Sequence, residues 1–369
     1  MGEKIVKVLI NASILRVQNT GLGVYTYYVL KYVCPLLERY NIDFDILCST
    51  KDVLPKNCVK HCVTIDYSNY FERNLKTIKV AKGYDLIWST TQHGTETSKK
   101  QIITIHDVIP LIYPKGRMHQ WIYYKFILKR YINKSTKIFT VSESTKKDIV
   151  KFYKCPQEKI KVLYEAIENK DKFIENSEQL LDHYNVEKQK YFVIVGIHYP
   201  YKNIHSVITA FKKFEELKDY KLVIIGKDKG KYGKSLKTLV EKYNLKNSIF
   251  FTGFTSEEEK NTLLNNCIAS VYPTLYEGFG LPLLEAMQIG VPVMSSNLSS
   301  LSEVGGDAVL YFNPLDVEDI KNKMLYVATD SKIRDELIVK GKQNLARFEW
   351  KNIAEKMASE ICHVLKDEK

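Results

Sequence analysis

Residues 269–296 read ASVYPTLYEGFGLPLLEAMQIGVPVMSS, a stretch that contains one complete strand–helix–strand unit. An apolar run at 269–273 leads into a Gly-Phe-Gly loop, a helix from residue 281 and a second apolar run at 291–296. Pro282 stands where the helix begins, a position at which its missing N–H group costs nothing. Two successive strands joined by a helix run parallel, so this stretch predicts a parallel α/β sheet.

The same alternation of Val- and Ile-rich runs with helical patterns extends over the whole chain. In the first half it predicts strands at 5–11, 43–48, 60–65, 84–88, 101–105, 137–141 and 160–163, and helices at 23–38, 71–81, 119–133 and 143–153. A polar linker with one helix, at 165–189, precedes a second series with strands at 191–196, 221–226, 248–253, 269–273, 291–296 and 308–312. Because 369 residues exceed one ordinary core, we expect two doubly wound, Rossmann-like domains facing across a cleft.

The domain boundary is predicted in the polar linker. It gives an N-terminal domain over 1–175 and a C-terminal domain over 176–369. The closing stretch, about 350–369, has apolar residues at helical spacing, and its periodicity does not say on which domain it packs.

The composition is that of a globular protein, with 45% hydrophobic and 27% charged residues and no apolar run near the ~20 residues of a membrane helix. The count of seven cysteines is odd, which favours reduced thiols in the cytoplasm. Cys58, His61 and Cys62 raise the possibility of zinc, but no second pair follows, so buried thiols and no metal are expected. The DFD at 43–45 alternates as one face of a strand does.

The net charge of +12 is uneven along the chain. Residues 1–185 carry 29 Lys and Arg against 19 Asp and Glu, whereas the remainder carries 26 against 24. A basic first half indicates an acidic partner surface: nucleic acid, anionic lipid or a phosphate-bearing substrate.

Part of this charge lies in a basic, aromatic segment at 115–135. The residues that could meet an anionic membrane or an acceptor are Lys115, Arg117, Trp121, Lys125, Lys129 and Arg130. Such a helix can lie on a membrane surface. It can equally cover the sheet, with its lysine stems lying along apolar surface. A peripheral location at the inner face of the membrane is therefore one of two interpretations.

The loops that follow strands hold the candidate functional residues, because ligands bind at the carboxyl ends of parallel strands. Glu277 lies in the Gly-Phe-Gly loop and Glu285 in the first turn of the helix, whose N–H groups favour an anion. The carboxylates would accept hydrogen bonds from hydroxyl groups. The alternative is that Glu277 is solvated and Glu285 only complements the helix dipole.

Three further positions follow strands. Gly21 and Gly23 form half of a dinucleotide fingerprint, but a third glycine is missing, so NAD binding is disfavoured. His106 is a candidate acid, base or hydrogen-bond donor, or a structural residue. Lys202, in the PYKN turn, suits a phosphate group as a point charge.

Taken together, these motifs resemble a known enzyme family. YEGFGLPLLEAMQIGVPV is similar to the E-x7-E signature of retaining glycosyltransferase family 4, which has the GT-B fold. TGLGVYTYYV, TIHDVIPLIYP, VSESTKKDI, PYKN, TGFTSEEE and FEWKNIAEKM match in the expected order, over nearly the whole chain. The resemblance implies a first domain that binds the acceptor, a second that binds a nucleotide-diphosphate sugar, and a last helix that crosses back to the first domain. It implies no metal and no cofactor.

The resemblance also implies a role for each matching residue. Glu285 would hold the ribose hydroxyls, Glu277 would face the donor sugar, and His106 would lie at the reacting face. The remaining donor-binding residues would be Gly21, Gly23, Lys202, Phe254, Thr255, Gly278, Phe279, Gly280 and Leu281. Within this set Lys202 would pair with the diphosphate, and Phe254 and Thr255 would hold the base.

One departure concerns the diphosphate. The family has an arginine near the lysine, but this chain has Ile197 and Tyr201 at those places. One diphosphate cation is therefore missing or comes from elsewhere, with Lys227 and Lys229 as candidates. The HDVIP and PxKN variants resemble mannosyl- and rhamnosyltransferases of surface-polysaccharide assembly. That implies GDP-mannose as donor and a glycan or lipid-linked acceptor, with no nucleic acid. The alternative is a non-catalytic GT-B scaffold or a basic nucleic-acid-binding protein.

Overall fold

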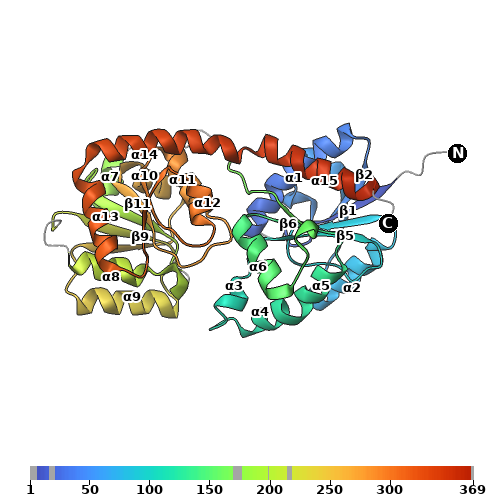
Figure 1. Ribbon diagram of the computed structural model, residues 1–369, viewed down its shortest axis with the longest axis horizontal. Helices are drawn as coiled ribbons and strands as arrows, with labels where there is room; N and C mark the ends of the chain where they lie inside the picture. The colour runs from blue at the N-terminus through green and yellow to red at the C-terminus, as the bar shows by residue number, and fades with distance from the viewer. Residues whose placement is uncertain (1–5, 16–20, 169–176, 198, 214–217, 367–369) are drawn as a thin grey trace. The chain divides into compact units, whose positions relative to one another are not determined.

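The computed structural model describes residues 6–15, 21–168, 177–197, 199–213 and 218–366, which form two compact units (Figure 1). The first unit consists of Met1–Ala166 together with Phe348–Lys369, and the second of Ile167–Arg347. Each unit contains one sheet, in which every pairing of neighbouring strands is parallel. The two expected Rossmann-like sheets are therefore confirmed.

The sheet of the first unit has seven strands in the order β3-β2-β1-β4-β5-β6-β7. Their bounds are β1 Lys7–Asn11, β2 Asp43–Cys48, β3 Cys62–Thr64, β4 Leu86–Ser89, β5 Lys100–Ile105, β6 Lys137–Thr140 and β7 Ile160–Val162. The direction in which the chain adds strands reverses between β1 and β4, which pair from Val8 opposite Leu86 to Asn11 opposite Ser89. Such a reversal leaves a crevice at the carboxyl ends of the strands, where ligands bind in this class of sheet.

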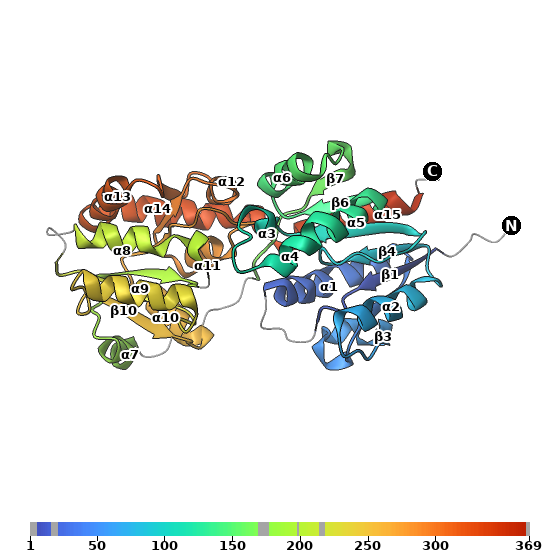
Figure 2. The same ribbon diagram turned by 90° about the horizontal axis from the view of Figure 1, so that it is seen from below.

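Helices on both faces cover this sheet (Figure 2). They are α1 Gly21–Arg39, α2 Tyr70–Ala81, α3 Ile109–Ile112, α4 Met118–Ile122, α5 Lys129–Lys134, α6 Glu143–Tyr153 and α15 Trp350–Lys366. The sequence predicts one helix over 119–133, but a π-helical turn, η3 Tyr123–Leu128, separates α4 from α5. An extra residue in that turn changes which side chains face the sheet, and hydrophobic periodicity does not reveal it.

The sheet of the second unit has six strands in the order β10-β9-β8-β11-β12-β13. Their bounds are β8 Tyr191–Val195, β9 Lys221–Ile225, β10 Ile249–Gly253, β11 Ala269–Tyr272, β12 Val293–Ser296 and β13 Val309–Phe312. The helices are α7 Ser177–His183, α8 Ile204–Lys212, α9 Lys231–Lys242, α10 Glu257–Asn266, α11 Leu281–Ile289, α12 Leu301–Gly305, α13 Val317–Thr329 and α14 Ser331–Asn344. Here the direction reverses between β8 and β11.

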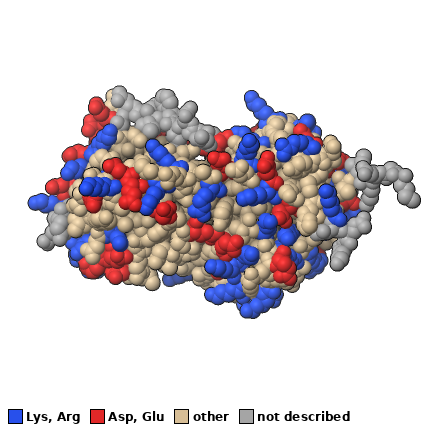
Figure 3. Space-filling model, turned by 45° about the horizontal axis from the view of Figure 1, so that its top comes forward, with Lys and Arg blue, Asp and Glu red and all other residues tan. Residues whose placement is uncertain are grey.

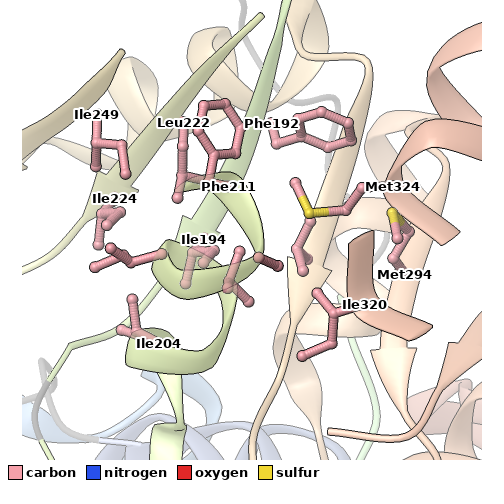
Figure 4. Close-up of a cluster of buried hydrophobic side chains, with 14 of the residues drawn as sticks. Phe192, Ile194, Ile204, Phe211, Leu222, Ile224, Ile249, Met294, Ile320 and Met324 are labelled. Atoms are coloured by element: carbon pink, nitrogen blue, oxygen red, sulfur yellow. The ribbon is translucent and has the colours of Figure 1, made fainter. Parts of the chain in front are cut away.

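One face of this second sheet carries a continuous apolar core (Figure 4). Strand residues such as Phe192 and Ile224 meet Phe211 of α8 and Met324 of α13 there, and all four side chains are almost fully buried. The strands read as unbroken Val and Ile runs because both of their faces are covered.

The C-terminal helix α15 packs on α1 of the first unit, as the resemblance implies (Figure 1). Trp350, at the start of α15, stacks on Tyr28 and Tyr32 of α1, with ring centroids 5.8 and 5.9 Å apart. The last helix therefore returns to the unit that contains the first strand.

The core of the second unit gives a test of its packing. Met324→Ala should lower the free energy of unfolding by about 2–5 kcal/mol, because it removes a fully buried side chain and leaves a cavity. Tyr326→Ala on the same helix, where the side chain is 44% exposed, is the control and should cost much less. Urea unfolding of both variants measures the difference, and equal losses would contradict this core.

Candidate functional site

Lys202 and Glu277 meet where the strand order of the second sheet reverses. Lys202 follows β8 and Glu277 follows β11, and these two strands are neighbours. The Lys202 Nζ lies 2.5 Å from Oε1 of Glu277, and about a fifth of each side chain is exposed. A pocket at this place is lined by both residues and by Gly196, Thr274 and Gly280. Parallel pairing thus brings together two residues that lie 75 positions apart.

The turn that carries Lys202 is fastened by the next residue, Asn203. Asn203 has a left-handed backbone, φ +56°, and only 2% of its surface is exposed. Its Nδ2 donates to the carbonyls of Pro273 at 3.1 Å and Pro314 at 2.8 Å. Asparagine suits this position because it tolerates the left-handed region and has two donors to share.

The loop that carries Glu277 is held from the next βα connection. The N–H of Glu277 donates to Ser299 Oγ at 2.8 Å, and Ser300 Oγ donates to the carbonyls of Glu277 and Phe279. Gly280 has φ +124°, and a Cβ there would lie 2.9 Å from Leu301. The loop conformation therefore requires glycine at 280 and two serines that the sequence does not single out.

Glu285 lies on α11 with its Oε2 2.8 Å from Nζ of Lys260 on α10. Both signature carboxylates therefore contact a lysine, and neither is simply solvated. Lys260 escapes a reading of the sequence because its loop, TGFTSEEEK, looks like an ordinary capping box, which Ser256 and Glu259 do form.

The positions where an arginine is expected are apolar and buried. Ile197 is 1% exposed and belongs to the core beside Ile194 and Ile224, so this place provides packing and no charge. Tyr201 is 8% exposed and stacks on Tyr199, with ring centroids 5.8 Å apart. Lys227 lies over the ring of Phe254 at 5.4 Å, and Phe254 is 77% exposed.

The other predicted donor residues lie near these. Thr255 follows Phe254 after β10, and Gly278, Phe279 and Leu281 belong to the Glu277 loop and the start of α11. Lys229 is exposed, beyond β9.

In the first unit His106 is buried at the end of β5 and makes contacts through both ring nitrogens. Nδ1 lies 2.8 Å from Oε1 of Glu165, and Nε2 lies 3.3 Å from the carbonyl oxygen of Thr90. The His106 ring also meets the ring of Tyr25 edge-on, with centroids 4.4 Å apart. Both oxygens are acceptors, so each ring nitrogen faces an oxygen that fixes the orientation of the ring.

Glu165 is the residue of this site that the sequence reading missed. It is only 8% exposed, although it opens the polar stretch interpreted as a linker. Its position soon after β7, at the carboxyl edge of the sheet, was the available signal. Burial, and then the charge of Glu165, raise the pKa of Tyr25, which therefore remains a neutral phenol at neutral pH.

Gly21 and Gly23 lie in the first turn of α1, at the same edge of the sheet. Gly21 is exposed and nothing lies within 4 Å of a Cβ built there, whereas Gly23 is buried. Asn19 and Thr20, which precede them in the motif, lie outside the described residues.

The basic, aromatic segment divides into an inner and an outer side. Arg117 is buried, whereas Lys115, Lys125, Lys129 and Arg130 are exposed. Lys125 lies over the ring of Trp121 at 4.3 Å, and Arg130 pairs with Glu96 at 3.0 Å. The outer side also exposes four apolar side chains: Met118, Ile122, Phe126 and Ile127.

The net positive charge of the chain belongs to the first unit. The first unit contains 31 Lys and Arg against 19 Asp and Glu, while the second contains 24 of each. On the face drawn in Figure 3 the basic side chains are interspersed with acidic ones. Across the described ranges, no helix is both long and apolar enough to cross a membrane.

The residues considered for zinc contact other groups. Cys58 Sγ donates to the carbonyl of Leu30, His61 Nε2 lies 2.7 Å from Glu38, and Cys62 Sγ lies 3.1 Å from Cys48 Sγ. Within the described part of the chain no three His, Cys, Asp or Glu gather as metal ligands would.

Comparison with known proteins gives the class. Two family descriptions match: "Glycosyltransferase Family 4" over residues 29–170 and "Glycosyl transferases group 1" over residues 176–344. The O-antigen chain mannosyltransferase RfbU of Salmonella typhimurium is 30% identical over 331 residues, which cover 84% of this chain and 87% of RfbU.

Two solved structures share the fold at low sequence identity. Sucrose-phosphate synthase of Thermosynechococcus elongatus has a TM-score of 0.74 and 17% identity, with 98% of this chain and 99% of that chain covered. HepE of Anabaena, solved in complex with UDP-glucose, has a TM-score of 0.71 and 16% identity, with 97% and 99% covered. The two parallel sheets are thus those of a GT-B enzyme.

More narrowly, the chain belongs to glycosyltransferase family 4. It is therefore a glycosyltransferase, and the resemblance of its signature segments is confirmed at the level of the family.

The His106 site gives a second prediction. Under the role that the resemblance implies for His106, Glu165→Gln should lower kcat by about a hundredfold, because the ring loses the carboxylate that orients it. The new amide can donate as well as accept, so it no longer fixes the orientation of the ring as the carboxylate does.

Nitrogen-15 spectra of His106, recorded on the full chain, distinguish a changed orientation of the His106 ring from a loss of folding. We expect the nitrogen-15 shifts of the His106 ring to differ between the wild type and Glu165→Gln, because the group opposite Nδ1 changes. Identical ring signals in the two proteins, with unchanged kcat, would contradict a positioning role. Glu168→Gln, three residues further on, is the control.

Proposed function

We propose that this protein transfers a sugar, with retention of configuration, from a nucleotide-diphosphate sugar to a glycan or lipid-linked acceptor. The observation that carries the proposal is the placement of both signature carboxylates against lysines at the carboxyl edge of the second sheet. The second unit binds the donor and the first unit the acceptor.

In this proposal the donor displaces the Lys202–Glu277 ion pair. The diphosphate takes over Lys202, a compact charge next to the helix start at α11. Glu277 then accepts hydrogen bonds from the sugar hydroxyls, and Glu285 from the ribose hydroxyls. Lys202 and Glu277 hold one another in place until the donor arrives.

The chemical step needs no metal in this scheme. The bond between the sugar C1 and the phosphate oxygen breaks, and the acceptor oxygen forms its bond to C1 on the same face. The acceptor proton passes to the leaving phosphate, which departs as part of the nucleoside diphosphate. Lys202 stabilises that leaving group by charge. Attack by Glu277 as a nucleophile is the second route, by analogy with retaining hydrolases.

Other lysines supply the positive charge that the missing arginine would place near the diphosphate. Ile197 provides no charge, so the second cation near the diphosphate must come from a different element. Lys260 contacts Glu285 and Lys227 lies over Phe254, so each touches a proposed donor residue and could supply that charge. Phe254 would carry the base on its exposed ring.

The donor and pathway are proposed from the relatives. RfbU bears the name of an O-antigen chain mannosyltransferase, which supports GDP-mannose as donor and surface-polysaccharide assembly as the setting. HepE was solved with UDP-glucose, so uridine donors belong in the same experiment.

A panel of nucleotide sugars tests the donor site by thermal unfolding. At a hundredfold excess over Kd the correct donor should stabilise the second unit by about 2.7 kcal/mol. Lys202→Met and Glu285→Ala should lose this stabilisation, while Lys234→Met, an exposed lysine of α9, should retain it.

Glu277→Ala and His106→Ala should lose transfer and donor hydrolysis. Wild-type turnover in all of these variants would overturn the site, and the lack of any donor effect would favour a non-catalytic scaffold.

We also propose that the outer side of α4 and η3 rests on an anionic membrane at the cytoplasmic face. Four exposed apolar side chains beside exposed lysines, in the unit that carries the whole net charge, support this.

Vesicle sedimentation tests the membrane contact. Replacing Ile122 and Phe126 together with serine should weaken binding to phosphatidylglycerol vesicles by about tenfold or more, since each buried apolar side chain contributes roughly 1.5 kcal/mol or more. Leu315→Ser, at an even more exposed apolar residue of the second unit, is the control. Equal partition of all three proteins would contradict the contact.

A further inference from the structure

Arg73, on α2, is a buried cation without a counter-charge in the part of the chain that the structure describes. The residue is 7% exposed, and its Nη2 is buried without any hydrogen-bond partner. Among the described residues no Asp or Glu forms an ion pair with it; the nearby Glu72 and Glu96 pair with Lys76 and Arg130. A guanidinium in this state destabilises the fold unless something else satisfies it.

The groups around Arg73 are aromatic and uncharged. Its guanidinium carbon lies 4.8 Å from the centre of the Tyr70 ring. Tyr70 meets Tyr123 edge-on at 5.9 Å and His93 at 5.7 Å. His93 Nδ1 lies 3.2 Å from the Tyr123 hydroxyl, which donates to the carbonyl of Gln92.

His93 adds no charge to this cluster at neutral pH. Burial, and then the charge of Arg73, lower the pKa of His93 to about 3. Its imidazole therefore serves as a neutral donor to Tyr123, and the charge of Arg73 remains uncompensated.

The position of the cluster points to a substrate. Arg73 lies in the first turn of α2, which follows β3, and His93 lies in the loop after β4, so both are at the carboxyl edge of the first sheet. Thr90, in the same loop, contacts Nε2 of His106. The cluster thus shares a loop with a contact of the residue proposed to stand at the reacting face, and Tyr70, whose ring lies over the Arg73 guanidinium, is 38% exposed.

We infer that Arg73 and Tyr70 form a subsite for an oxyanion carried by the sugar acceptor. A guanidinium fork matches the geometry of a carboxylate or a phosphate, and it would exchange its unpaired N–H groups for two charge-assisted hydrogen bonds. The Tyr70 ring stacks against the other side of the guanidinium. Gln92, whose Oε1 is also buried and unpaired, would accept from an acceptor hydroxyl. This inference rests on the proposed transferase function and specifies its acceptor as an acidic glycan or a sugar phosphate.

Three probes test the subsite: glucuronate, glucose 1-phosphate and glucose, each added to the full chain at ionic strength matched with chloride. The measurements are made in a Lys202→Met background, so that binding of phosphate at the donor site does not contribute. We expect the unfolding temperature to rise with glucuronate, glucose 1-phosphate or both, and not with glucose. A rise in the unfolding temperature with glucuronate alone indicates an acceptor carboxylate, and a rise with glucose 1-phosphate alone indicates an acceptor phosphate.

Variants then locate the effect. Arg73→Met should lose the rise, and Arg39→Met, an exposed arginine of α1 in the same unit, should keep it. Should Arg73→Met fail to fold, two other variants replace it: Arg73→Lys removes the guanidinium fork, and Tyr70→Ala removes the ring that lies over it. No rise beyond the chloride control, or the same rise in the Arg73 variants, would overturn the subsite and leave a buried water as the partner of Arg73. Nucleotide-sugar binding is measured separately on the wild type, so a failure there would overturn the donor proposal and leave this result standing.

Discussion

Parallel strand pairing is the constraint on which the functional groups of this glycosyltransferase depend. In a parallel sheet every loop that follows a strand emerges at one edge, and the loops on either side of a reversal in strand order lie across a crevice. The reversal between β8 and β11 brings Lys202 to Glu277. In the other sheet the reversal between β1 and β4 places α1 and the loop of Thr90 on either side of His106.

Several charged side chains in these loops lie against a partner in the described part of the chain, whereas Arg73 does not. Glu277 and Glu285 each hold a lysine, and Glu165 lies against His106. Each of these half-buried or buried pairs gives both of its members a polar partner. Each pair also contains a residue that the proposed function places against a substrate. Arg73 is different because, among the described residues, its guanidinium lies against the Tyr70 ring and forms no ion pair. A site that remains unbalanced is expected to receive its counter-charge from a ligand.

Much of this structure could be predicted because it follows from residue patterns within short segments of the sequence. The alternation of Val and Ile runs with helical periodicity predicts all thirteen strands to within a few residues, and the E-x7-E segment marks the family. The helices α13 and α14 carry no assignment from the sequence, and η3 interrupts a predicted helix. Lys260 and Glu165 also escape prediction, since their significance comes from partners 25 and 59 residues away. Arg73 escapes it because only the folded chain shows that its Nη2 is buried without a hydrogen bond among the described residues.

The sequence by itself determined the parallel α/β class, the family signature, the loops that contain Glu277, Lys202 and His106, and the absence of an arginine at Ile197. These follow from local periodicity, from glycine and proline positions, and from residue identity. Only the tertiary structure decided which charges meet, how the serines pin the Glu277 loop, and that Arg73 is buried without a counter-charge. The physical reason is that burial and pairing depend on strand order and crossover path, which bring distant segments together and are not written in any one segment.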